Sequence, residues 1–207
     1  MVSHSVQKLF VEGGGDNDAL RTECRRAFTK LMERAGLSGR KPRVVACGGR
    51  QRAYDQFCVA LDHSQAGDLA LLLVDAEAPV VSASPWEHVR SRPGDGWKRP
   101  PLAGDEHLHL MVQCMESWLL ADRSALRSFF GNGLQDNALP VPTAIESMPT
   151  TEALAKLQHA SQPCKTKGKY DKAAHSFLLL ELVDPTALRA ASPWADRFFK
   201  ALESMLA

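Results

Sequence analysis

In the first 122 residues, short apolar runs alternate with longer stretches in which apolar residues recur at helical spacing. The apolar runs KLFV, RVVAC, LALLLV and HLHLMV have the length of β-strands. Between the first two, Leu20, Cys24, Phe28 and Leu31 recur every three or four positions, which predicts a helix from Asp16 to Ala35 with Asp16 as its N-cap. A second helix follows RVVACGG. The order strand, helix, strand, helix, strand, loop, strand, helix predicts an α/β fold with a small, mostly parallel sheet flanked by helices.

The pattern changes after Asp122, where strand signals stop. The segments LRSFF, TEALAKLQ, DKAAHSFLLLEL and PWADRFFKALESML all have helical character. We therefore expect an α/β domain over residues 1–122 and a C-terminal helical annex over residues 123–207 that packs on it. The stretch from Pro79 to Gly104 is rich in proline and glycine and is predicted to be an irregular loop.

Composition restricts the function classes. The chain has 25 basic and 24 acidic residues, so it has no overall charge that attracts a polyanion, and any nucleic-acid contact must come from local patches. No apolar run approaches the ~20 residues of a membrane span, and the first residues lack the pattern of a signal peptide. The five cysteines form no CxxC pair. These features predict a cytoplasmic protein without a membrane partner.

Acidic residues follow three of the predicted strands. Glu12 ends the first strand, Asp75 and Glu77 follow the third in the motif DAE, and Glu116 follows the fourth. Carboxyl ends of parallel strands meet at one edge of the sheet, so we expect these acids to converge there. If extended backbone continues through Ala76, both acids of DAE point to the same side. Hard oxygen ligands suit Mg²⁺ or Mn²⁺, which predicts metal ligation by Asp75, Glu77 and Glu116.

Glycines and an arginine near these acids indicate phosphate binding. Gly13 and Gly14 let the backbone turn sharply behind Glu12, and the next helix offers its N-terminal N–H groups to an anion. Arg50, in GGRQR, opens the second helix as a further phosphate contact. The alternative for each acid taken singly is a helix cap or a solvated loop residue.

A lysine-rich stretch, PCKTKGKYDK, precedes a helix in the annex. It offers Lys165 and Lys167 as contacts to a phosphate backbone, and Lys169 and Lys172 as groups that stabilise charge on a transferred phosphoryl group. The alternative interpretation is a solvated loop.

The acids at the strand ends resemble those of the TOPRIM domain of topoisomerases, primases and OLD-type nucleases. In that family a glutamate ends the first strand and a DxD pair follows a later one, whereas the pair here is DxE. The resemblance covers residues 8–122 and implies a TOPRIM-like fold with Rossmann-like layering. It also implies that Glu12 is the acid/base residue and that Asp75 and Glu77 hold Mg²⁺.

Longer phrases resemble a second, uncharacterised family. MVQCMESWLLAD, KGKYDKAAHSF and SPWADRFF are similar to domain-of-unknown-function family 4276, which is TOPRIM-like. Members of that family often lie beside ATPases in bacterial defence-type loci, so the resemblance implies an ATPase encoded nearby as a partner.

Together these features predict Mg²⁺- or Mn²⁺-dependent phosphodiester chemistry on DNA or RNA, foremost as a TOPRIM-type endonuclease (a hydrolase). The alternative is a binding module: a catalytically degenerate TOPRIM-like fold that acts as the partner of an ATPase.

Overall fold

A four-stranded, all-parallel sheet forms the centre of the fold in the computed structural model, which describes residues 5–207. The strand order is β2-β1-β3-β4. The strands are β1 (Gln7–Gly14), β2 (Arg43–Gly48), β3 (Leu69–Asp75) and β4 (Leu108–Met111). The α-helices are α1 (Asp18–Met32), α2 (Arg50–Asp62), α3 (Pro85–Ser91), α4 (Met115–Leu120), α5 (Arg123–Phe130), α6 (Thr150–Ser161), α7 (Lys172–Leu180), α8 (Pro185–Ala191) and α9 (Pro193–Met205). The α/β prediction is confirmed.

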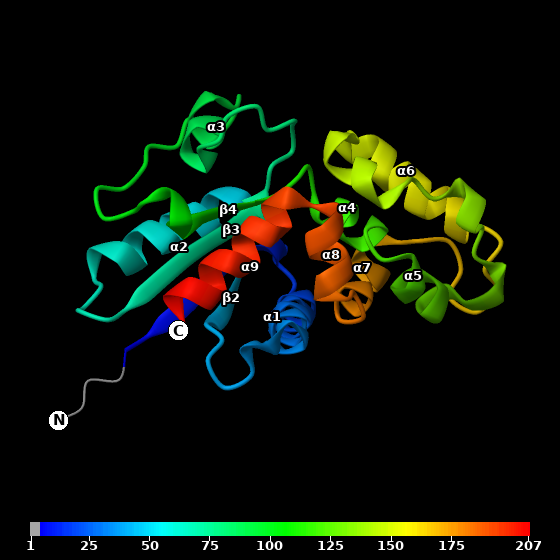
Figure 1. Ribbon diagram of the computed structural model, residues 1–207, viewed down its shortest axis with the longest axis horizontal. Helices are drawn as coiled ribbons and strands as arrows, with labels where there is room; N and C mark the ends of the chain where they lie inside the picture. The colour runs from blue at the N-terminus through cyan, green and yellow to red at the C-terminus, as the bar shows by residue number, and fades with distance from the viewer. Residues whose placement is uncertain (1–4) are drawn as a thin grey trace.

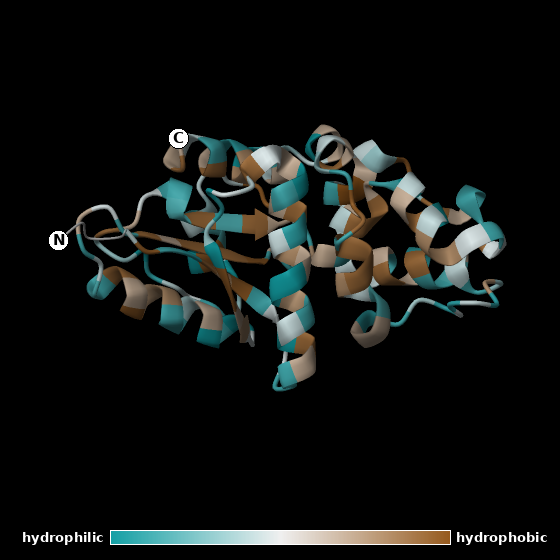
Figure 2. Cartoon of the chain, turned by 90° about the horizontal axis from the view of Figure 1, so that it is seen from below, coloured by the Kyte–Doolittle hydropathy of each residue, from teal (hydrophilic) through white to brown (hydrophobic). Residues whose placement is uncertain are grey.

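Helices cover both faces of the sheet because successive strand residues point to opposite sides. Leu9 and Leu71 face a core that α1, α4 and the C-terminal helices complete. Phe10 and Leu72 face a second core that is closed by α2, α3 and the loop around Trp97. Figure 2 shows the same layering, with hydrophobic strands between helices whose outer faces are hydrophilic.

The helices beyond Asp122 share the first core with the sheet rather than forming a separate one. Helix α9 packs on β4, and α7 packs on α1. Figure 1 shows that α4 to α8 lie beyond the carboxyl ends of the strands, so helices cover that end of the sheet. The amino ends of the strands lie at the opposite end of the molecule.

Local signals explain where the first helix begins and ends. The side chain of Asn17, not the predicted Asp16, caps α1 by accepting hydrogen bonds from the backbone N–H groups of Ala19 (2.9 Å) and Leu20 (3.2 Å). After α1 a π-helical turn spans Glu33–Leu37, and Gly36 adopts a φ of 83°, which breaks the helical path.

The stretch from Pro79 to Gly104 contains α3, so the prediction of an irregular loop throughout is wrong there. The loop is held against α2 by Trp97, whose ring stacks on Tyr54 with centroids 4.5 Å apart. The indole N–H of Trp97 also donates a hydrogen bond to Gln51 Oε1 (2.9 Å). This anchoring fixes Arg92 and Asp95, which precede Trp97 in the same loop, near the carboxyl edge of the sheet.

Candidate active site at the carboxyl edge of the sheet

Glu12 and Asp75 lie on neighbouring strands, and the backbone of Asp75 contacts the side chain of Glu12. β1 pairs with β3 in register up to Val11 and Leu73. The backbone N–H of Asp75 points at Glu12 Oε2 across 3.4 Å. The parallel sheet thus brings together two acids that are 63 residues apart in the chain, as the sequence predicted.

The glycines behind Glu12 are needed for close packing of the turn. Gly13 and Gly14 both pair with Gly48, which makes a β-bulge that redirects the chain as it leaves the strand. A Cβ on Gly14 would lie 2.7 Å from Arg21 Cα, and a Cβ on Gly48 would lie 2.4 Å from the carbonyl oxygen of Gly15. The motif therefore packs β1 tightly against α1 and β2, and it also forms part of a cavity wall.

Arg50 is engaged by other protein groups. Its Nε and Nη2 donate to the two oxygens of Asp95 at 2.8 and 2.7 Å, and the guanidinium lies 4.8 Å from the centre of the Trp97 ring. Its Nη1 donates to Glu12 Oε2 (3.2 Å) and to the backbone carbonyl of Asp75. Arg50 therefore holds Glu12 and the end of β3 in place, and its position does not test the predicted phosphate contact.

Glu116 is buried, with 2% of its surface exposed, although it lies in the first turn of α4. Lys172 Nζ lies 3.1 Å from Glu116 Oε1, and the hydroxyl of Tyr170 donates to the same carboxylate at 3.2 Å. Ser176 Oγ lies 2.6 Å from the Tyr170 hydroxyl. This polar network joins α4 to α7 and fixes Lys172 next to the strand ends.

Glu77 does not continue the strand. β3 ends at Asp75, and Glu77 has a φ of 56°, an uncommon backbone conformation for a residue other than glycine. The regular strand thus ends one residue before Ala76, and the chain leaves the extended conformation at Glu77. Glu77 forms an ion pair with Arg92, yet it still lines the same cavity as Asp75.

Asp75 differs from the other acids in having no ion-pair partner within residues 5–207. Its Oδ1 accepts a hydrogen bond from the backbone N–H of Met115 (2.8 Å). Burial, followed by the charge of Glu12, raises the pKa of Asp75 well above its usual value. Burial also raises the pKa of Glu12 against the opposing effect of Arg50. Both shifts favour the protonated, neutral carboxyl when no cation is bound at the strand ends.

Two cavities meet at Asp75 and Lys172. One, of about 430 Å³, extends between the glycine turn, α1 and α7. The other, of about 330 Å³, is bordered by Glu77, Glu116 and α6. The pKa of Lys172 is raised by Glu116 and Asp75 although burial opposes the shift, so this lysine keeps its positive charge at the junction.

The other lysines of PCKTKGKYDK lie elsewhere. Lys165, Lys167 and Lys169 are exposed on the loop before α7, and none of them lines either cavity. Lys167 lies over the ring of Phe129, with Nζ 4.8 Å from its centre. Of the four lysines, the structure brings Lys172 alone to the acids.

Glu12 and Asp75 are the acids best placed to hold a divalent metal ion. Within residues 5–207, no group of three His, Cys, Asp or Glu side chains is placed to hold a metal. Mg²⁺, however, commonly uses one or two carboxylates together with waters and substrate phosphates. Glu12 and Asp75 offer such a pair, because both line the 430 Å³ cavity and both have raised pKa values.

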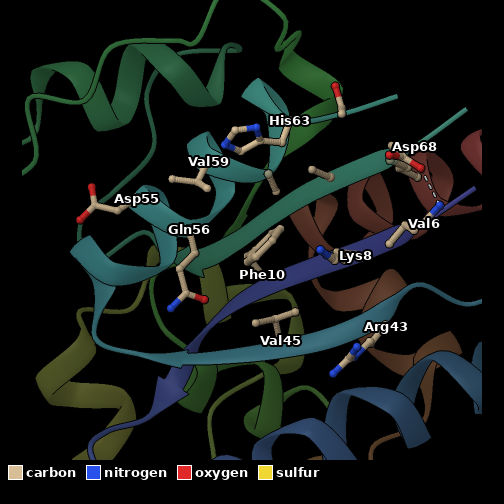
Figure 3. Close-up of a pocket in the computed structure, with 14 residues that line it drawn as sticks. Val6, Lys8, Phe10, Arg43, Val45, Asp55, Gln56, Val59, His63 and Asp68 are labelled. Carbon is tan, nitrogen blue, oxygen red and sulfur yellow. Dashed lines mark hydrogen bonds between the residues drawn. The ribbon is translucent and has the colours of Figure 1, made fainter. Parts of the chain in front are cut away.

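A larger cavity, of about 590 Å³, lies at the opposite end of the sheet (Figure 3). Phe10 and Val45 form its floor from β1 and β2, and Val59 of α2 and His63, which follows α2, also line it (Figure 3). It contains none of the predicted site residues. Since ligands of parallel α/β sheets bind at the carboxyl ends of the strands, we place the candidate site at the carboxyl edge, although each cavity there is smaller.

Sequence reasoning missed four side chains of this site. Arg92 and Asp95 come from the loop, and Tyr170 and Ser176 belong to the network around Glu116. Arg92 and Asp95 belong to no motif of the sequence. Tyr170 and Ser176 lie within the phrase KGKYDKAAHSF, but nothing in that phrase connects them to Glu116.

Comparison with known proteins assigns the family. None of the helices in residues 5–207 is long and apolar enough to cross a membrane. No curated protein and no solved structure matches the chain. The model of a domain of unknown function, DUF4276, matches residues 11–203, which include every acid of the candidate site. The chain belongs to the DUF4276 family.

Proposed function

We propose that the protein carries out metal-dependent phosphodiester cleavage of nucleic acid, as a TOPRIM-type endonuclease. The observation that carries this proposal is Asp75: a carboxylate with a raised pKa and no ion-pair partner in residues 5–207, at the carboxyl edge of a parallel sheet, where two cavities meet. A carboxylate in this state favours a bound cation.

In this proposal Asp75 and Glu12 hold Mg²⁺ or Mn²⁺. A bound ion would polarise the phosphoryl group and neutralise charge on the leaving oxygen. Glu12 accepts a proton from the attacking water. Lys172 contacts the phosphate at the junction of the cavities, and Arg50 keeps the Glu12 carboxylate in position. Glu77 and Glu116 stay paired with Arg92 and Lys172.

The test is cleavage of plasmid, single-stranded DNA and RNA in Mg²⁺ or Mn²⁺ by the wild type and by Glu12→Gln and Asp75→Asn. Glu12→Gln is expected to lose at least about 100-fold, since one acid/base group contributes about 10²–10⁴-fold. Asp75→Asn is expected to lose activity because it removes a metal ligand. Glu87→Gln is the matched control because Glu87 is an exposed acid on α3. Equal activity in all four proteins would refute the proposed roles.

A second candidate function is supported by the ion pairs. Glu12, Glu77 and Glu116 are each bound by a cation of the protein, namely Arg50, Arg92 and Lys172. Such pairing suits a catalytically degenerate module that serves as the partner of an ATPase encoded nearby.

Titration with Mn²⁺ by calorimetry separates the two functions. The nuclease binds Mn²⁺ and loses this binding in Asp75→Asn. The module binds no metal and cleaves nothing, and both its wild type and Asp75→Asn form the same complex with the purified ATPase.

A further inference from the structure

The two cavities at the carboxyl edge differ in chemistry. The 430 Å³ cavity is walled mainly by apolar groups, among them Leu20, Met115 and Phe177. The 330 Å³ cavity is more polar: about half of its lining is polar, and Glu77, Glu116, Thr150 and Thr151 contribute to it. A ligand that occupies both must therefore combine an apolar portion with a polar, charged portion.

Lys172 marks where the charged portion lies. It borders both cavities together with Asp75, and it is positioned by the network of Glu116, Tyr170 and Ser176. Tyr170 is 1% exposed, so the groups that position Lys172 lie in the packed interior, whereas the Lys172 side chain itself is 61% exposed and accessible to a ligand. An anionic group of the ligand can be bound by Lys172 while the apolar portion enters the 430 Å³ cavity beside it.

The wall of the apolar cavity contains an aromatic ring close to the backbone. The ring of Phe177 approaches Gly13 so closely that a Cβ on Gly13 would lie 3.4 Å from Phe177 Cζ. Phe177 belongs to α7 and Leu20 belongs to α1, and both line the cavity. A volume of about 430 Å³ is within the range of small-ligand sites. Aromatic and aliphatic walls suit a flat ring such as a nucleobase.

We propose that the apolar cavity receives one unstacked nucleobase while its phosphate lies at Lys172, so the substrate is single-stranded nucleic acid. This rests on the function proposed above, which it narrows to a substrate class. A base inside a duplex is stacked and paired, and it cannot enter a cavity between α1 and α7 without leaving the helix. A single strand meets no such cost beyond local unstacking.

The test measures whether the base contributes to binding. Calorimetric titration in Mg²⁺ compares 2′-deoxyadenosine 5′-monophosphate with 2-deoxyribose 5-phosphate, which has the same phosphate and no base. The nucleotide is expected to bind at least about tenfold more tightly, since stacking on an aromatic side chain has an effect of this size.

Variants locate the base. Leu20→Trp fills the apolar cavity and is expected to abolish the advantage of the nucleotide over the sugar phosphate. Val59→Trp is the matched control, because Val59 is 57% exposed and lines the cavity at the opposite end of the sheet. The preference of Val59→Trp for the nucleotide over the sugar phosphate should equal that of the wild type. Should Leu20→Trp not fold, as judged by circular dichroism, Phe177→Leu replaces it and should reduce the preference at least about threefold.

Equal affinity for the two compounds, or a preference that Leu20→Trp and Phe177→Leu leave intact, would overturn the inference. Its failure is distinguishable from failure of the nuclease function. Metal-dependent cleavage of single strands and duplexes at equal rates, without a base preference, would remove the inference and keep the nuclease. A base preference in a protein that cleaves nothing would keep the nucleobase site and remove the nuclease.

Discussion

Replacing Arg50 by methionine tests whether this arginine holds the site together. Its side chain is 12% exposed, and that of its partner Asp95 is 2% exposed. Removing one member of a buried ion pair typically costs about 3–5 kcal/mol, because the other charge stays buried without its partner. Arg92 still donates to Asp95 Oδ1 at 2.9 Å, so we expect a loss near the lower end, about 3 kcal/mol.

The assay is urea unfolding at neutral pH, supported by thermal unfolding. A loss of about 3 kcal/mol corresponds to a decrease in Tm of about 6–12 °C for a chain of this size. Arg52→Met is the matched control, since Arg52 lies two positions further along α2, is 54% exposed and faces Asp16 across 3.5 Å. This exposed pair contributes about 0–1 kcal/mol.

Equal stabilities of Arg50→Met and Arg52→Met would refute the reasoning, because the ion pairs of Arg50 would then contribute no more to the free energy of unfolding than an exposed pair. A stable Arg50→Met protein that had lost only its affinity for phosphate would instead support the phosphate contact predicted from GGRQR. The comparison therefore separates an arginine that organises the site from one that binds substrate.

Two further predictions concern proton binding and backbone packing. Because the pKa of Asp75 is raised in the native state, ionisation opposes folding as the pH rises above about 4, and Asp75→Asn in chelator should be more stable than the wild type by a margin that grows toward neutral pH. Asp68 has a lowered pKa, so Asp68→Asn should be less stable than the wild type by a margin that is constant above about pH 4 and shrinks below it. Urea unfolding from about pH 2 to about pH 8 measures both margins, and the same pH dependence in the two variants would contradict the assignment. Gly48→Ala should lower the Tm clearly more than Gly36→Ala. Both positions have positive φ, which costs an alanine about 1–2 kcal/mol of stability. The new Cβ at Gly48 would also clash with the carbonyl oxygen of Gly15, whereas a Cβ at Gly36 has no atom within 4 Å. Similar losses would contradict the close packing of the glycine turn.

The acids of the site were predictable because sheet topology brings them together. Once Glu12 and Asp75 are recognised at the ends of parallel strands, neighbouring positions follow from the connection rules of α/β folds. The sequence also signals the end of β1, since glycines follow Glu12 directly. These inferences need only the local pattern and the direction of the strands.

The ion-pair partners of the acids were not predictable, because the pairs depend on the course of loops whose sequences have no periodic pattern. Asp95 reaches Arg50 through a loop whose course is set by the stacking of Trp97 on Tyr54. Glu77 turns away from the strand through a positive φ that no residue type at that position signals. A single sequence specifies such contacts only through the completed packing of the fold.

Which lysine reaches the acids was likewise not predictable from the sequence. Lys169 and Lys172 are equivalent in a pattern of basic residues, but α7 begins at Lys172 with Asp171 as its N-cap. The first turn of that helix faces the acids, whereas Lys169 lies on the exposed loop before it. The point at which the helix begins thus decides which lysine reaches the site, and helix boundaries are poorly defined by sequence patterns.

The charge balance of the site links the two candidate functions. Five carboxylates lie together at this edge (Glu12, Asp75, Glu77, Asp95 and Glu116), and three cations pair with them (Arg50, Arg92 and Lys172). The excess of two negative charges can be met by protons, as the raised pKa values of Glu12 and Asp75 indicate, or by one divalent ion. In a nuclease, Mg²⁺ should therefore raise the Tm of the wild type at neutral pH and have no effect on Asp75→Asn, because amide substitution removes one of the two charges and a metal ligand. In a binding module the protons suffice, and Mg²⁺ should leave the Tm of both proteins unchanged.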